Sequence, residues 1–165
     1  MTRVSTVPNS SPTFSIRIAN ATDVPAIVAV VNAAFAIETF LQGTRTDAEG
    51  VAEMMQKGEF LVAESAAGSI VASVYAELRG ERGYFGMLAV EPSQQGLGLG
   101  RMMVEATEKH CRSHGCKHMD ITVLSLRPDN LSLYRKFGYL ETGTEQFHPP
   151  PSRKVGVECH LFSVE

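Results

Sequence analysis

The stretch EPSQQGLGLGR, residues 91–101, decides how this sequence is interpreted. It places Gly96, Gly98 and Gly100 at alternate positions, between an apolar run and a run with helical periodicity. A strand that passes through glycines into a helix leaves unpaired backbone N–H groups at the positive end of the helix dipole. The stretch therefore predicts that a phosphate-bearing ligand approaches the backbone here.

Two common phosphate-binding loops do not fit these glycines. The dinucleotide fingerprint G-x-G-x-x-G needs a third glycine where the sequence has Arg101, counted from Gly96, or Met103, counted from Gly98. A P-loop needs Gly-Lys followed by Ser or Thr, which occurs nowhere in the sequence. One glycine would be enough for a tight turn alone, so three favour a ligand over a purely structural role.

Hydrophobic periodicity predicts the element order β α α β β β α β α β β, a mixed α/β fold with a mostly antiparallel sheet and helices on both faces. Strands are expected at 14–18, 60–65, 69–79, 84–90, 117–124, 139–147 and 157–164, and helices at 21–38, 46–58, 96–114 and 128–138. Candidate helix caps are Thr22 and Asp23 for the first helix and Thr46 for the second. The apolar face expected for the third helix comprises Leu99, Met102, Met103, Ala106 and His110.

Length and composition predict one soluble domain. Residues 1–13 are rich in Ser, Thr, Pro and Asn and are expected to form a flexible tail, with a single domain over 14–165. The net charge of −3 offers no basic field for nucleic acid, and no apolar run is long enough to span a membrane. Three cysteines and the absence of a signal-peptide core predict a cytoplasmic protein with reduced thiols.

The glycine stretch and a second motif together resemble a known family. The segment MLAVEPSQQGLGLGRMMVEATE resembles the acyl-CoA loop of the GNAT superfamily of acetyl-CoA-dependent N-acyltransferases, in which Leu-Ala-Val runs into Gln/Arg-x-x-Gly-x-Gly, here Gln95, Gly98 and Gly100. The segment LRPDNLSLYRKFGY resembles the downstream motif, with Tyr134 before a Gly-Tyr pair. The resemblance covers roughly residues 14–164, and the predicted element order is also that of the family.

The resemblance implies that acetyl-CoA, or another acyl-CoA, is a co-substrate. In the usual family motif an asparagine lies seven residues before the tyrosine, but Arg127 stands there and Asn130 lies four before it. Which of the two contacts the pantetheine arm stays open. The cofactor-binding residues that the resemblance implies are Leu88, Ala89, Val90, Gln95, Gly96, Leu97, Gly98, Leu99, Gly100 and Arg101, with Arg127 and Asn130.

Acetyl transfer from a thioester to an amine needs a neutral amine, stabilisation of the tetrahedral oxyanion and a proton for the departing thiolate. The resemblance implies that the strand before the loop splays from its neighbour, so that backbone N–H groups near Leu88 and Val90 bind the cofactor and the thioester oxygen. It also implies that Tyr134 is the general acid, a role that suits a tyrosine hydroxyl because its ordinary pKa is near 10. An ordinary core tyrosine is the competing interpretation, since Tyr134 shares an apolar helix face with Leu131 and Phe137.

The general base is less well defined by the sequence. Glu77 lies in the apolar strand segment SVYAEL, beside the strand expected to splay, and its carboxylate could accept the amine proton directly or through water. Glu38, at the end of the first helix, and a water chain with no single base are the alternatives. Structurally, Glu77 could instead form ion pairs with Arg79 or Arg82.

The segment HCRSHGCKH, residues 110–118, gathers histidines and cysteines, but it matches neither H-E-x-x-H nor a paired Cys-x-x-Cys pattern. We therefore expect no metal site there.

The function expected from the sequence is transfer of an acetyl or other acyl group from acyl-CoA to a primary amine of a small molecule or a polypeptide, by direct attack in a ternary complex. The alternative is a catalytically silent acyl-CoA-binding sensor on the same fold. The acidic balance disfavours nucleic acid as the acceptor. The acceptor amine, the acyl-chain preference and the presence of a homodimer stay open.

Overall fold

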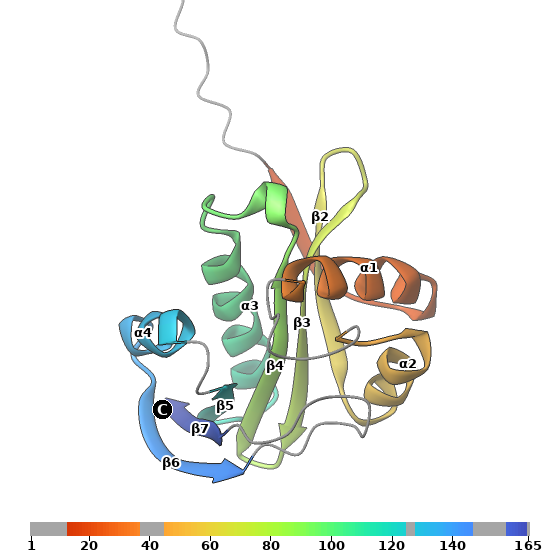
Figure 1. The fold of residues 1–165 in the computed structure, drawn as a ribbon. Helices are drawn as coiled ribbons and strands as arrows, with labels where there is room; N and C mark the ends of the chain where they lie inside the picture. Colours follow the sequence, from red (N-terminus) through yellow and green to blue (C-terminus); the bar gives the residue numbers. More distant parts are fainter. Residues whose placement is uncertain (1–12, 37–44, 125–127, 147–157, 165) are drawn as a thin grey trace, which may run out of the picture.

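The computed structural model describes residues 13–36, 45–124, 128–146 and 158–164. Seven strands form one sheet in the order β1-β2-β3-β4-β5-β7-β6, with helices on both faces (Figure 1). The strands are β1 (Phe14–Ile18), β2 (Glu59–Ser65), β3 (Ile70–Arg79), β4 (Arg82–Val90), β5 (His118–Leu124), β6 (Leu140–Gln146) and β7 (Glu158–Val164). The helices are α1 (Val24–Phe35), α2 (Ala48–Lys57), α3 (Leu99–Ser113) and α4 (Pro128–Lys136), with short 3-10 turns η1 (Ala21–Asp23) and η2 (Pro92–Gln94).

The predicted element order and fold class are confirmed, with small differences at element ends. The expected tail at 1–13 lies, except for its last residue, outside the described residues. The assignment of 14–165 to a single domain stays a prediction.

The sheet separates two cores because successive side chains of a strand point to opposite faces. In β2, Phe60 and Val62 pack toward α1 and α2, whereas Leu61 and Ala63 pack toward α3 and α4. All four side chains are buried. A central strand that is apolar on both faces therefore needs helices on both sides, and Figure 1 shows α1 and α2 on one side of the sheet with α3 and α4 on the other.

The strands β4 and β5 are parallel and separate early. Every other neighbouring pair in the sheet is antiparallel. The ladder between β4 and β5 joins only residues 82–84 to residues 118–120, although β4 continues to Val90 and β5 to Leu124. Beyond this ladder β4 stays paired with β3, and β5 stays paired with β7. The sheet therefore opens between β4 and β5, as the resemblance implied.

The buried face of α3 differs from the one that periodicity predicted. The helix buries Leu99, Met103, Val104, Thr107 and Cys111, whereas Met102 is 41% exposed. Thr107 is tolerated in the core because its hydroxyl donates to the carbonyl oxygen of Met103 at 2.7 Å. Including Met102 in the apolar face was therefore wrong, whereas the side chain of His110 is only 17% exposed.

Of the expected helix caps, Asp23 occupies the N-cap position of α1 without a side-chain cap bond to that helix, and Thr46 lies one residue before the cap of α2. Asn20 caps the first helical segment: its side chain accepts from the N–H of Thr22, and the carboxylate of Asp23 accepts from the N–H of Asn20. The cap of α2 is Asp47, whose carboxylate accepts from the N–H of Gly50 at 2.7 Å. Thr46 instead pairs through its backbone with the side chain of Asn32.

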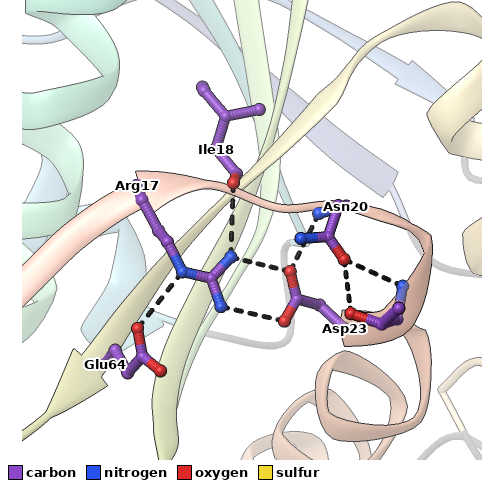
Figure 2. Close-up of polar contacts among 6 residues, drawn as sticks. Arg17, Ile18, Asn20, Asp23 and Glu64 are labelled. Carbon is purple, nitrogen blue, oxygen red and sulfur yellow. Dashed lines mark hydrogen bonds and ion pairs between the residues drawn. The ribbon is translucent and has the colours of Figure 1, made fainter. Parts of the chain in front are cut away.

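A partly buried ion pair ties β1 to the start of α1 (Figure 2). The guanidinium of Arg17 donates two hydrogen bonds to the carboxylate of Asp23, at 2.8 and 2.9 Å, and a third to Glu64 at 3.2 Å. The Asp23 residue is only 7% exposed. The hydrogen bonds from Arg17, together with that from the N–H of Asn20, hold the pKa of the Asp23 carboxyl below its usual range.

We expect Asp23→Asn to lower the free energy of unfolding by about 1–2 kcal/mol at neutral pH, because it removes a charge-assisted, two-pronged contact in a buried place. Chemical denaturation followed by circular dichroism measures this. Glu64→Gln is the matched control. It loses one longer bond at a more exposed site, so less than about 0.5 kcal/mol should be lost.

The effect of Asp23→Asn should depend on pH. A carboxyl group whose pKa is lowered by folding stabilises the protein at pH values above its unfolded pKa, which is about 3.9. The difference in stability between wild type and variant should therefore be constant above about pH 5 and shrink as the pH falls through the folded-state pKa. A difference that grew on acidification would contradict the assignment.

Candidate active site

The largest set of predicted site residues meets in one cavity of about 490 Å³. It lies between the glycine stretch, the end of β4, helix α4 and the last turn of α1. Its volume is within the range of small-molecule binding sites. The predicted residues that line it are Leu88, Val90, Gln95, Gly96, Gly98, Leu99, Gly100, Arg101, Asn130 and Tyr134.

The glycines leave the floor of this cavity open. Gly96 and Gly98 have φ angles of 83° and 79°, in the left-handed region that favours glycine. A Cβ atom at Gly98 would meet no atom within 4 Å, and one at Gly100 would meet only the side chain of Val90, at 3.9 Å. Gly98 is the N-cap of α3 and makes no side-chain cap bond, so the N–H groups of the first helical turn keep their capacity to bind an anion.

The end of β4 presents backbone groups to the gap beside β5. The N–H of Glu91 donates to the carbonyl oxygen of Val71 at 2.8 Å, which makes these two a hydrogen-bonded pair. In an antiparallel ladder the adjacent residue Val90 then directs its N–H and carbonyl away from β3. The amide of Gln95 donates to that carbonyl at 3.0 Å, so this side chain closes the loop as well as lining the cavity.

A β-bulge in β4 was not anticipated from the sequence. Ser73 pairs with Ala89 and Tyr75 with Gly86, so two residues of β4, at positions 87 and 88, oppose one residue of β3. Met87 has a φ of 52°, and it is the only non-glycine residue of the described chain with positive φ. Gly86 was the available signal, because a glycine inside a strand often marks a bulge. The bulge redirects the backbone at Leu88, which lines the cavity.

A second, smaller cavity of about 110 Å³ lies where β4 and β5 separate. It is lined by residues 84–88 of β4 and 121–123 of β5, and by Phe35 and Arg45. Leu88, Asn130 and Tyr134 line both cavities. Phe35 on α1 lines both cavities as well, so the two cavities meet at Tyr134 in the opened part of the sheet.

Aromatic rings hold Tyr134 at this junction. Its ring centroid lies 6.1 Å from Phe85, 6.1 Å from Phe137 and 6.0 Å from Tyr139, in tilted or edge-on arrangements. Only 8% of the residue is exposed. Tyr134 is thus both a packed residue of α4 and a lining residue of the cavities, so the two interpretations of its role are compatible.

Glu77, the predicted base, is bound by other side chains and does not line either cavity. Its carboxylate accepts from Arg79 at 2.9 Å and from the hydroxyl of Tyr75 at 2.7 Å, and these bonds lower its pKa. Glu77 is not among the described residues that line either cavity. Arg82, the other suggested partner of Glu77, pairs instead with Asp120 at 2.7 Å.

Some of the other predicted residues lie away from the cavity or outside the described chain. The side chain of Ala89 is buried in the core under α1 and α2, and Leu97 is 53% exposed. Arg127 and Glu38 lie outside the described residues. Of the two candidates for the pantetheine contact, only Asn130 is therefore placed, and it lines both cavities.

The histidine and cysteine cluster is used in local packing. The rings of His110 and His114 lie 4.5 Å apart, and His110 contacts Glu59 at 2.7 Å. The described residues contain no group of three or more His, Cys, Asp or Glu side chains placed to hold a metal ion. No helix in the described parts of the chain combines the length and apolar composition that crossing a bilayer requires.

Comparisons with known proteins place this geometry in a family. Three similar solved structures are a ribosomal-protein-S18-alanine N-acetyltransferase from Escherichia coli, a ribosomal-protein-alanine N-acetyltransferase from Brucella melitensis and an N-acetyltransferase from Staphylococcus aureus Mu50. Their TM-scores are 0.74, 0.72 and 0.73, at 16%, 18% and 16% sequence identity. The matches cover 92%, 91% and 93% of this chain and 93%, 98% and 98% of the others.

These structures share the fold of the chain, and their low identities support no statement beyond the fold. No curated protein sequence matches the chain. The model of the acetyltransferase (GNAT) family matches residues 30–139, which include the glycine stretch, Tyr134 and about two thirds of the chain. The chain belongs to the GNAT family of acetyltransferases, whose general function is acyl transfer.

Proposed function

We propose that the protein transfers an acetyl group from acetyl-CoA to a primary amine of a small molecule or polypeptide, by direct attack in a ternary complex. The observation that carries this proposal is the meeting of two cavities at Tyr134, one floored by the glycine stretch and one between β4 and β5. Two substrates, one in each cavity, can then meet at Tyr134.

The larger cavity fits acetyl-CoA. The open glycine floor and the unpaired N–H groups at the start of α3 suit its phosphates, because a helix N-terminus attracts anions. The N–H of Val90, which points away from β3, and the bulged backbone at Leu88 could bind the pantetheine arm and the thioester oxygen of acetyl-CoA. Asn130 is our choice for the side chain that contacts the arm. When bound, acetyl-CoA supplies an acetyl thioester.

Tyr134 would act as the general acid. As the amine nitrogen bonds to the acetyl carbon and the carbon–sulfur bond breaks, its hydroxyl donates a proton to the departing thiolate and is reprotonated from solvent. Its position at the junction of both cavities suits this role. The products are an N-acetylated amine and CoA.

For the base, the geometry favours water over Glu77. A carboxylate bonded to Arg79 and Tyr75, with a lowered pKa, is a poor proton acceptor for an amine. Water in the opening between β4 and β5 can carry the amine proton to solvent. This is the second of the alternatives that the sequence left open.

The compartment we propose is the cytoplasm. Cys111 and Cys116 are free thiols, both buried in the core around α3, which suits a reducing compartment.

One experiment distinguishes an acetyltransferase from a catalytically silent acyl-CoA sensor. The protein is incubated with acetyl-CoA and a panel of primary amines that includes polyamines, amino acids and N-terminal peptides, and products are detected by mass spectrometry. We expect at least one amine to gain an acetyl group in proportion to enzyme concentration. Tight acetyl-CoA binding with no acetylated product across the panel would favour the sensor.

A further inference from the structure

We propose that the acceptor is a small primary amine that also carries an oxyanion, such as a carboxylate, and that Arg45 binds this oxyanion. The inference rests on the proposed function, because it concerns the cavity in which the amine would lie. It narrows the acceptor from any primary amine to a class defined by its charge.

Arg45 is the only charged residue among the described residues that line the cavity between β4 and β5. The others are aromatic, aliphatic or neutral polar residues. Asn130, Thr122 and the tyrosines of this lining are polar but neutral, so none of them balances the charge of Arg45. A cationic amine with no other charge would be repelled there, whereas an amine with an oxyanion could pair with Arg45.

The position of Arg45 is fixed by its neighbours. The side chain of Asn32, on α1, makes two hydrogen bonds of 3.0 Å with the backbone of Thr46, the next residue. The guanidinium of Arg45 lies over the ring of Phe35, 5.2 Å from its centroid. Both contacts hold Arg45 against the end of α1, so the guanidinium is preorganised beside the cavity.

The hydrogen-bonding capacity of Arg45 is not used up by the described parts of the chain. Its Nε is buried and has no hydrogen-bond acceptor, and no carboxylate of the described residues pairs with the guanidinium. No acceptor of the described residues therefore competes with a bound ligand for the guanidinium. A carboxylate matches the planar guanidinium because it can accept two parallel hydrogen bonds.

The size of the cavity favours a small acceptor. A volume of about 110 Å³ is below the roughly 300–1,000 Å³ of typical small-molecule pockets. Tyr134 and Arg45 both line this one cavity. An amine placed at Tyr134 would therefore be separated from its oxyanion by only a few atoms, as in an amino acid. Proximity to the guanidinium would also favour the neutral form of the amine, which is the form that attacks.

The test compares L-amino acids with their primary carboxamides at saturating acetyl-CoA. Each pair presents the same amine and differs by one negative charge. We expect the wild-type protein to have a higher kcat/KM for the amino acid of the best pair. Arg45→Gln should reduce that preference by about 10- to 100-fold, the range of a charge-assisted hydrogen bond. Arg45→Lys should restore part of it, and Arg112→Gln, which removes a charge on the exposed side of α3, should leave it unchanged.

A binding measurement separates this inference from the proposed function. Calorimetry of the same amino acids with the CoA-saturated protein should show binding that Arg45→Gln weakens at least tenfold, with the melting temperature reporting that the variant is folded. Amides preferred by the wild type, as for a peptide N-terminus, or equal preference in Arg45→Gln, would overturn the oxyanion site. If no amine is acetylated although amino acids bind through Arg45, the transferase proposal fails and the oxyanion site stands.

Discussion

Tyr134→Phe is expected to lower turnover about 100-fold while leaving acetyl-CoA affinity nearly unchanged. The substitution keeps the ring and its contacts with Phe85, Phe137 and Tyr139 but removes the hydroxyl. A loss of this size is typical of general acid catalysis, and it should appear in kcat if thiolate departure limits the rate. Single-turnover kinetics with the best amine of the panel measure it. Wild-type turnover in a folded variant would reduce Tyr134 to a packing residue.

Tyr139→Phe provides the matched control. Tyr139 is fully buried beside Tyr134, but its hydroxyl donates to Glu108 at 2.8 Å and it lines neither cavity. Removing this hydroxyl should cost about 1–2 kcal/mol of stability, because the half-buried Glu108 loses a donor. Turnover per folded molecule should stay at the wild-type value. The two variants therefore separate loss of chemistry from loss of packing.

The fold could be predicted from the sequence because its elements have strong local signals. The strand at 14–18 alternates cleanly, and β2 and β3 form apolar runs separated by turn residues. The errors in the predicted helix face and helix caps arose where polar side chains form hydrogen bonds with nearby backbone groups. Thr107 is buried by bonding to its own helix, and Asn20 caps a 3-10 turn that precedes α1. The periodicity of one sequence does not distinguish polar side chains that are hydrogen-bonded to nearby backbone from polar side chains at the surface.

The candidate site could be predicted only in part, for a different reason. The glycine stretch and Tyr134 belong to motifs that are continuous in the sequence, so their place beside one cavity was expected. The bulge at Met87 and the position of Arg45 arise from tertiary pairing between distant segments. Glu77 shows the opposite case: its residue type and strand suggested a base, but the partners Arg79 and Tyr75 occupy its carboxylate.

Gly98→Val is expected to weaken acetyl-CoA binding at least tenfold, about 1.4 kcal/mol. The valine side chain would fill the open space above the loop, where the phosphates must approach the first N–H groups of α3. It would also be strained, because Gly98 has a φ of 79°, and an L-residue there costs about 1–2 kcal/mol. Calorimetry with acetyl-CoA must therefore be read against a control with the same strain.

Gly115→Val is that control. Gly115 has a φ of 89°, and a Cβ there would also meet no atom within 4 Å, but it lies after α3 and lines neither cavity. Both variants should lose similar stability, and only Gly98→Val should lose affinity.

Gly100→Val tests the approach of the phosphates without backbone strain. Gly100 lies inside α3 without positive φ, and a Cβ there would touch only Val90. The variant should weaken acetyl-CoA binding without the strain that Gly98→Val introduces. If Gly98→Val and Gly100→Val both bind acetyl-CoA as the wild type does, the phosphates do not approach this backbone. The glycines would then serve only to turn β4 into α3.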